Sequence, residues 1–279
     1  MANKPFLFLD INYKLDDRLM LSEVLESEKF ELIGISANNR HYSSNDVADR
    51  LLEDFFDYGI SMPIAKTNEL NIKDQKIITT KLENNDKKNK HYIEEDEAID
   101  YIYKAAKDCE VMDIITTGPL TTIAGAIEKY EDFTDYINHI FILGGAFLKG
   151  DVTNDAEINI YNDPLAADIV FRSNIDVFLL PIDLSNTIIL KDEIIANHKE
   201  NSLIREYMRL PEDQRYISAA LLFYMYLTPE AFIFEEMGLK VDTKYQRGKL
   251  KEDNDRKKNL VANKVNIDSF YEFVESLIS

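Results

Sequence analysis

Short apolar runs alternate with amphipathic segments along most of the chain. The runs at 6–9 and 112–116 are bounded by polar turn residues and have the length of buried strands. Between such runs, apolar residues recur every three or four positions, as on helices with one buried face. The pattern predicts strands at 6–9, 30–37, 62–65, 112–116, 139–143 and 177–182, and helices at 16–26, 45–58, 93–107, from Pro119 onward, 163–171, 191–226 and 267–278.

Two segments depart from this alternation. Residues 68–92 are polar and rich in Lys, Asn and Asp, which predicts a solvated surface loop. Residues 231–265 show interrupted strand alternation around Arg247 and Gly248, which predicts a hairpin with an exposed tip. Strands separated by helices imply an α/β fold with a mostly parallel sheet and right-handed crossovers. Because no repeat or Pro/Gly/Ser linker interrupts the pattern, we expect a single domain over 1–279.

The charge balance narrows the class of partner. The 279 residues include 32 basic and 51 acidic side chains, giving a net charge of -19. Such a surface repels phosphate backbones and anionic membranes, so we expect no nucleic-acid partner and no membrane partner. The first ten residues lack a signal-peptide layout and no apolar stretch is long enough to span a bilayer, which predicts a cytoplasmic location. The single cysteine, Cys109, fits a reducing compartment.

The densest polar chemistry follows the first predicted strand. Asp10, Asn12, Asp16 and Asp17 place three carboxylates and one amide within eight residues. Crowded carboxylates repel one another unless a cation or a hydrogen-bond network holds them, and Ca²⁺ or Mg²⁺ would suit these oxygens. A second interpretation is structural: Asp16 caps the following helix and Asp17 complements its dipole. The residues alone leave both interpretations open.

Further candidate segments follow two later predicted strands. The carbonyl groups near Thr117 could ligate a cation, or they could simply lead into a helix. Gly144 and Gly145 permit close backbone approach to a ligand, or only a tight turn. The loop at 150–164 is rich in carboxylates and amides, as suits a sugar, but an ordinary polar loop has the same composition. Ligands of open parallel sheets bind beyond the carboxyl ends of the strands, so we expect these segments to contribute to one site.

Three long motifs, taken in order, are more specific than any single segment. They are ITTGPLTTIAGAI at 115–127, FILGGAF at 141–147 and AEINIYNDPLAADIVF at 156–171. With them the chain resembles, nearly end to end, the nucleoside hydrolase family (inosine/uridine-preferring nucleoside N-ribohydrolases). The resemblance implies an open, mostly parallel Rossmann-like sheet flanked by helices, with a small C-terminal hairpin and a closing helix. It also implies cleavage of the N-glycosidic bond of a nucleoside, a bound Ca²⁺, and a homodimer or homotetramer.

The opening motif of the family is Asp-x-Asp-Pro-Gly-x-Asp-Asp, and this chain matches it in part. Asp10, Asp16 and Asp17 match, whereas the aspartate that serves the family as general base falls on Asn12. An amide cannot take a proton from water. The resemblance therefore implies a catalytic set of Asp10, Asn12 and Asp16 in which Asp10 or Asp16 must replace the lost base.

The resemblance also implies roles for the other site residues. It implies metal ligation by Asp17 and by the backbone carbonyl of Thr117, and sugar or substrate binding by Asn39, His41, Asp151, Glu157 and Asn159. The His-Asp pair of the family falls on Ser218 and Ala219. The resemblance implies that this aspartate and the one replaced by Asn12 are both metal ligands in the family, so two of its three metal-ligating carboxylates are absent. We therefore expect Ca²⁺ to bind weakly or not at all, because its affinity depends on the number and charge of its ligands.

Two functional hypotheses follow from these substitutions. In the first, the protein is a hydrolase of a ribonucleoside or a related ribosyl compound, with weak or altered activity and Tyr224 serving the leaving group. In the second, it is a catalytically inactive protein that binds a nucleoside or a ribose-like ligand.

Overall fold

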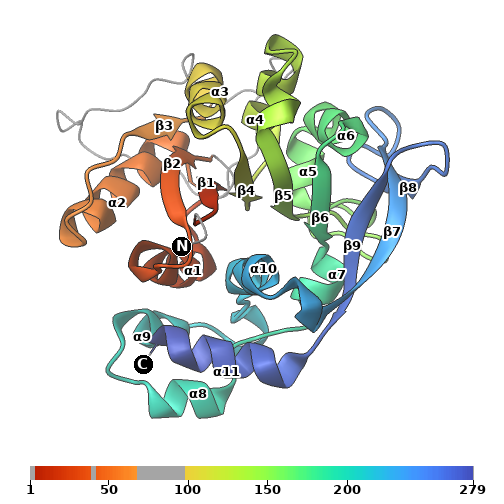
Figure 1. The fold of residues 1–279 in the computed structure, drawn as a ribbon. Coiled ribbons are helices and arrows are strands. Elements are labelled where there is room, and N and C mark those ends of the chain that lie inside the picture. The colour runs from red at the N-terminus through yellow and green to blue at the C-terminus, as the bar shows by residue number, and fades with distance from the viewer. Residues whose placement is uncertain (1–3, 39–41, 68–97, 279) are drawn as a thin grey trace.

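The computed structural model describes residues 4–38, 42–67 and 98–278 (Figure 1). The expected loop at 68–92, and with it the start of the helix expected at 93–107, lies outside the described residues. The described strands form one nine-stranded sheet in the order β3-β2-β1-β4-β5-β6-β9-β7-β8. The strands are β1 (Phe6–Ile11), β2 (Glu31–Ala37), β3 (Ile64–Lys66), β4 (Met112–Thr116), β5 (Ile137–Leu143), β6 (Asp176–Leu180), β7 (Phe232–Val241), β8 (Leu250–Glu252) and β9 (Lys258–Val265).

Helices cover both faces of this sheet (Figure 1). They are α1 (Leu15–Glu26), α2 (Ser44–Asp57), α3 (Ala98–Cys109), α4 (Thr121–Lys129), α5 (Ile158–Asn162), α6 (Pro164–Arg172), α7 (Ile182–Ser185), α8 (Asp192–Asn197), α9 (Ser202–Tyr207), α10 (Ser218–Leu227) and α11 (Ile267–Ile278). The predicted α/β architecture, with its mostly parallel sheet, is confirmed. Within the described ranges, no helix has the length and apolar character needed to cross a membrane.

The first strand shows why the sheet needs helices on both sides. Successive side chains of a strand point to opposite faces, and Leu7, Phe8 and Leu9 are all fully buried. Leu7 and Leu9 pack into a core that includes residues of α1, α2, α10 and α11. Phe8 packs into a second core formed with α3, α4 and α6. A continuous apolar run therefore marks a central strand of a parallel sheet.

The strand order reverses between β1 and β4, and this reversal positions the site. The chain runs from β1 outward to β2 and β3, and then from β4 outward to β5 and β6 in the opposite direction. Asp10 at the end of β1 pairs in register with Thr116 at the end of β4. Open α/β sheets bind ligands in the crevice at such a reversal, beyond the carboxyl ends of the strands.

The single helix predicted at 191–226 is wrong. The structure divides this segment into α8, α9, a short 3-10 helix at Glu212–Gln214, and α10. Asn201 caps α9 by accepting hydrogen bonds from the backbone N–H groups of Leu203 and Ile204. Pro211, which has no backbone N–H, precedes the 3-10 helix. Capping and proline residues thus interrupt a segment whose apolar pattern looks continuous.

The strand predicted at 177–182 is also too long, because β6 ends at Leu180, before Pro181, and α7 follows. The predicted hairpin at 231–265 is present but is part of the main sheet. Its strand β9 pairs parallel with β6 and antiparallel with β7. The closing helix α11 packs against α10 and α1.

Candidate functional site

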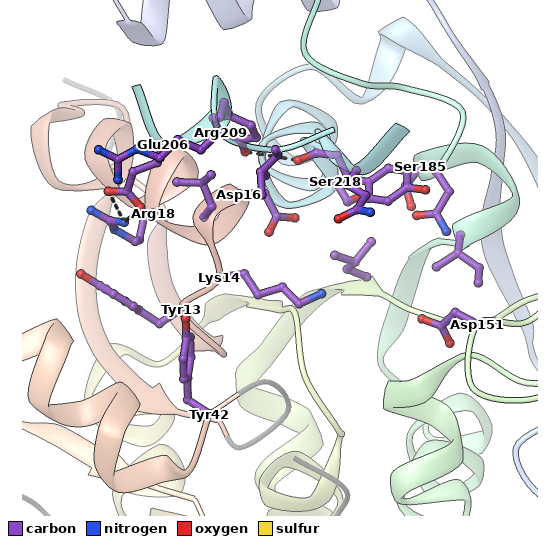
Figure 2. Close-up of a pocket in the computed structure, with 18 of the residues that line it drawn as sticks. Tyr13, Lys14, Asp16, Arg18, Tyr42, Asp151, Ser185, Glu206, Arg209 and Ser218 are labelled. Atoms are coloured by element: carbon purple, nitrogen blue, oxygen red, sulfur yellow. Dashed lines mark hydrogen bonds and ion pairs between the residues drawn. The ribbon is translucent and has the colours of Figure 1, made fainter. Parts of the chain in front are cut away.

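A cavity of about 710 Å³ lies beside the crevice between β1 and β4. Its volume is within the range that small-molecule sites occupy. The start of α1 lines one side, and the loop before α5 lines a second side (Figure 2). Tyr42 and Arg50, before and on α2, and the segments from α7 to α10 complete the lining. Asp16, Asp151 and Glu157 line this cavity together, although they are far apart in the sequence.

Asp10 lies beneath the cavity and is not one of its lining residues. Its fully buried carboxylate accepts hydrogen bonds from Ser36 Oγ at 2.6 Å, Asn38 Nδ2 at 2.7 Å and Thr116 Oγ1 at 3.2 Å. Burial raises the pKa of Asp10 to about 6, and the three hydrogen bonds oppose that rise. The carboxylate therefore ties together the ends of β1, β2 and β4.

Asn12 and Asn159 both hold the backbone carbonyl of Thr117. Their Nδ2 atoms donate to that oxygen at 2.7 Å and 3.0 Å, and Asn159 Nδ2 also donates to the Leu143 carbonyl at 2.8 Å. Turning either amide would place two carbonyl oxygens within hydrogen-bond distance, so these contacts set both orientations. The buried Oδ1 atom of each amide has no hydrogen-bond partner within the described residues. Two buried acceptors beside the Thr117 carbonyl are thus left without a donor from the described residues, which is uncommon for buried polar groups.

Asp16 and Asp17 occupy the first turn of α1, where the helix dipole favours negative charge. Asp17 Oδ2 accepts from the backbone N–H of Lys14 at 2.7 Å, and Oδ1 accepts from Thr117 Oγ1 at 2.6 Å. Asp16 Oδ2 accepts from the backbone N–H of Ala219 at 3.2 Å. Asp17 therefore bonds to the backbone at the start of α1, the position that the sequence assigned to Asp16.

The ionised form of Asp17 is disfavoured by its surroundings. Burial, and after it the neighbouring charge of Asp16, raise its pKa to about 7. Hydrogen bonds from Thr117 and from the backbone of Lys14 oppose the rise, as does the positive charge of the Lys14 side chain. Desolvation penalises a charged carboxylate most where another anion lies beside it.

The Tyr13-Lys14 turn directs a cation into this acidic environment. Tyr13 has a φ of 59°, which is uncommon for a residue other than glycine. Its side chain is buried, and its hydroxyl donates to Asp54 Oδ2 at 2.7 Å. Figure 2 shows Lys14 extending into the space between Asp16 and Asp151.

The loop before α5 supplies the opposite wall. Glu157 Oε2 accepts from the backbone N–H groups of Gly145 at 3.0 Å and Ile160 at 3.2 Å, so this side chain caps α5. Asp151 Oδ1 accepts from the N–H of Ile158 at 2.8 Å. Gly145 has a φ of 80°, so only glycine fits this close approach without strain. These contacts hold two carboxylates against the cavity.

The segments between α7 and α10 that cover the cavity were not predicted as part of the site. Arg18 Nη1 donates to both carboxylate oxygens of Glu206, at 2.9 Å and 2.8 Å, and Arg209, Gln214 and Tyr216 also line the cavity. The polar residues between 205 and 216 were a possible signal, but they fall within the single helix predicted at 191–226. Ser218 lines the cavity and Ala219 contacts Asp16, as their alignment with the family's His-Asp pair implies.

Two other expectations have different outcomes. Tyr224 does not line the cavity: its hydroxyl donates to Ser269 Oγ at 3.0 Å, and its ring packs against Phe232 and Phe270. Its expected role with the leaving group is therefore not supported. Asn39 and His41 lie outside the described residues.

The donor set at the expected metal position does not fit a tightly held divalent cation. The Thr117 carbonyl already accepts from two amide groups, and both oxygens of Asp17 accept hydrogen bonds. The positive charge of Lys14 acts on Asp17 and would oppose a second cation. No group of three or more His, Cys, Asp or Glu side chains suited to a metal occurs among the described residues. Asn12 contributes no negative charge, which Ca²⁺ sites use to gain affinity.

Comparison with known proteins agrees with this arrangement of segments. The family model of the inosine-uridine preferring nucleoside hydrolases matches residues 7–272. Uridine nucleosidase 1 of Arabidopsis thaliana is 31% identical over 145 residues, which cover 47% of this chain and 43% of that protein. The non-specific ribonucleoside hydrolase RihC of Escherichia coli is 36% identical over 91 residues, covering 33% of this chain and 30% of that protein. The matched region thus spans less than half the length of these curated relatives.

Solved structures show the same fold over almost the whole chain. A plant nucleoside hydrolase superposes with a TM-score of 0.84 at 18% identity, covering 98% of both chains. A purine-preferring ribonucleoside hydrolase from Gardnerella vaginalis gives a TM-score of 0.82 at 22% identity, again with 98% of both chains covered. With a family model that matches nearly the full length, the chain belongs to the inosine-uridine preferring nucleoside hydrolase family.

Proposed function

We propose that this protein binds a ribonucleoside, or a related ribosyl compound, in the cavity and hydrolyses its N-glycosidic bond. The observation that carries the proposal is the convergence of Asp16, Asp151 and Glu157 on one cavity at the carboxyl ends of the strands. Membership of the nucleoside hydrolase family supports the reaction type.

The polar groups of the cavity suit the sugar of such a ligand. Ribose hydroxyls are hydrogen-bond donors, and Asp16, Asp151 and Glu157 offer carboxylate acceptors. Asn12 and Asn159 are not among the lining residues, but each has a buried Oδ1 atom without a hydrogen-bond partner within the described residues. Cleavage of a glycosidic bond passes through a transition state that resembles an oxocarbenium ion, which nearby negative charge stabilises.

Asp16 is the better candidate for the general base. A base must lie within hydrogen-bond reach of the water that it activates. Asp16 lines the cavity and its Oδ2 accepts one hydrogen bond, from Ala219. Asp10 is buried below the cavity and accepts from three side chains. We therefore propose that Asp10 holds the strand ends in place while Asp16 orients and deprotonates water.

A second candidate function is ligand binding without turnover. Asn12 stands where the family resemblance places the base, and Ala219 stands where it places a carboxylate. Loss of a general base alone typically lowers a rate by about 10²–10⁴-fold. These substitutions predict a slow enzyme, and they favour a pure binding protein if Asp16 cannot take over.

The two functions are separated by measuring reducing-sugar release from inosine, uridine, adenosine and cytidine, together with binding by calorimetry. We expect slow turnover of at least one nucleoside, and we expect Asp16→Asn to lower it by about 10² or more while binding persists. Asp57→Asn, at an exposed position on α2, is the matched control and should leave turnover unchanged. Binding without sugar release by the unaltered protein would establish the second function, and the absence of both would contradict the proposal.

A further inference from the structure

We propose that the Lys14 ammonium group, one of four basic side chains that line the cavity with Arg18, Arg50 and Arg209, serves the ligand in place of a divalent metal ion. The inference rests on the proposed function for the class of ligand, a ribonucleoside or ribosyl compound. The position and surroundings of Lys14 within the chain carry it independently of any ligand.

Local structure fixes where the Lys14 side chain begins. Its backbone N–H donates to Asp17 Oδ2 at 2.7 Å, which places it at the residue preceding α1. The residue before it, Tyr13, has a φ of 59° and is anchored by its hydroxyl to Asp54 at 2.7 Å. The backbone is therefore held on both sides of the Cα atom, and the side chain leaves it toward the cavity (Figure 2).

The charges around Lys14 call for a cation at this position. Asp16, Asp151 and Glu157 line the same cavity, and Asp17 is buried directly behind Asp16 in the first turn of α1. Neighbouring buried carboxylates repel one another unless a positive charge compensates them. Lys14 provides such a charge from the lining of the same cavity.

Most of the oxygen atoms expected to hold a metal are already engaged in protein contacts: both oxygens of Asp17 and the Thr117 carbonyl accept hydrogen bonds. Two amide groups donate to the Thr117 carbonyl, and these contacts turn the Oδ1 atoms of Asn12 and Asn159 away from it. A divalent ion at that carbonyl would compete with the two amide contacts and with the positive charge of Lys14 that acts on Asp17. A lysine ammonium instead brings three hydrogen-bond donors and a single charge, which match carboxylates and ligand hydroxyls without dehydrating a metal ion.

The first test measures metal binding directly. Protein treated with EDTA is titrated with CaCl₂ up to about 1 mM, followed by thermal unfolding and native mass spectrometry, since tight binding raises Tm by several degrees. We expect no stoichiometric Ca²⁺ and no change in Tm for the unaltered protein. In the double variant, Asn12→Asp adds a carboxylate and Lys14→Gly removes the positive charge. This variant should gain Ca²⁺-dependent stabilisation. One bound Ca²⁺ in the unaltered protein would overturn the proposal.

The second test measures ligand affinity. Dissociation constants for the four ribonucleosides are compared in EDTA and in CaCl₂, and should agree within about twofold. Lys14→Gln should weaken binding by about 10-fold or more, whereas Lys14→Arg should retain most of the affinity because it keeps the charge. Lys104→Gln, on the exposed surface of α3, is the matched control for loss of a lysine. Circular dichroism confirms that each variant is folded.

The outcomes distinguish this inference from the proposed function. Equal binding by Lys14→Gln and the unaltered protein, or binding that requires Ca²⁺, overturns the role of Lys14 and leaves the proposed function standing. If none of the nucleosides binds under any condition, the proposed function fails. In that case the metal titration still decides the inference, because gain of a Ca²⁺ site only in the double variant supports the role of Lys14.

Discussion

At the scale of single residues, Asp10 is an acidic residue of the family motif whose carboxylate joins neighbouring strand ends by hydrogen bonds. Its carboxylate is fully buried and accepts from Ser36, Asn38 and Thr116, which belong to or directly follow β2 and β4. The charge is tolerated because three donors face it, although burial still raises its pKa to about 6. The folded protein therefore binds a proton at Asp10 more readily than the unfolded chain does.

This difference predicts a pH dependence of stability. Between the ordinary pKa of 3.8 and the folded value of about 6, the folded state carries more protons, so the contribution of Asp10 to stability falls as pH rises. The contribution is greatest below pH 4, is lost across that interval by up to about 3 kcal/mol, and is level above pH 6. Urea unfolding at several pH values measures it. Asp10→Asn should remove this slope.

The exposed carboxylate of Asp57 supplies the control for Asp10. Because the net charge of -19 also weakens the fold as pH rises, only the difference between variants isolates one residue. Asp57→Asn should leave the slope of stability against pH close to that of the unaltered protein. An unchanged slope in Asp10→Asn would contradict the raised pKa.

At the scale of elements, the cover of the cavity depends on local stop and start signals. Asn201 Oδ1 accepts from two backbone N–H groups at the start of α9, and α9 carries Glu206 to its contact with Arg18. An N-terminal cap satisfies donors that the helix itself leaves unbonded. The short helices α8 and α9 therefore exist as separate elements that can close over the site.

Removal of this cap should loosen the cover. Asn201→Ala is expected to cost about 1 kcal/mol of unfolding free energy, as is typical for loss of an N-cap side chain. It should also weaken ligand binding, because α9 carries cavity-lining residues. Asn197→Ala, at an exposed position on α8, should cost less, since alanine favours helix. Equal losses in the two variants, measured by urea unfolding, would rule out the capping role.

The same elements show how far the sequence predicts this protein. The strands and the crevice were predictable because fully apolar runs such as Leu7 to Leu9 identify buried parallel strands. Their carboxyl ends brought Asp16 and Glu157 to one cavity, as the order of the motifs implied. The direction of Lys14 was not predictable, because it depends on the φ of 59° at Tyr13, which tertiary packing stabilises. The separate helices that cover the cavity were not predictable either. The apolar periodicity of the sequence continues across the boundaries between α8, α9, the 3-10 helix and α10.

At the scale of the whole molecule, the C-terminal hairpin contacts the α5 side of the cavity. Arg247, in the turn between β7 and β8, donates from Nε to the Tyr161 carbonyl at 2.8 Å and from Nη2 to the Asn162 carbonyl at 2.9 Å. Both carbonyls belong to α5, the helix that Glu157 caps. Gly248, with a φ of 81°, lets this turn approach the backbone of Tyr161 closely.

Loss of this contact should affect the cavity from a distance. Arg247→Ala leaves two carbonyl groups at the end of α5 without their charged donor, so we expect a loss of about 1–3 kcal/mol in unfolding free energy. Ligand affinity should fall as well, because Glu157 and Asn159 are carried by the loosened segment. Lys244→Ala, in the same turn but exposed, should change neither quantity. Calorimetry measures the ligand affinity, and urea unfolding measures the unfolding free energy. An unchanged affinity in Arg247→Ala would show that the hairpin does not influence ligand binding.

The assembly of the protein in solution stays a prediction at this scale. The resemblance to its family implies a homodimer or a homotetramer, and light scattering on the purified protein measures the mass directly. A monomeric mass would contradict that expectation. The cytoplasmic location stays a prediction in the same way, and fractionation of the source cells tests it.

The bridge from Arg247 to α5 also constrains the order in which the chain can mature. Its partners are separated by 86 and 85 residues in sequence, so the bridge cannot form until Arg247 has been synthesised. A nascent chain that ends after β6 already contains Asp16, Asp151 and Glu157, but its α5 still lacks the contact with Arg247. The segment that carries Glu157 therefore gains this support only after the hairpin has been synthesised.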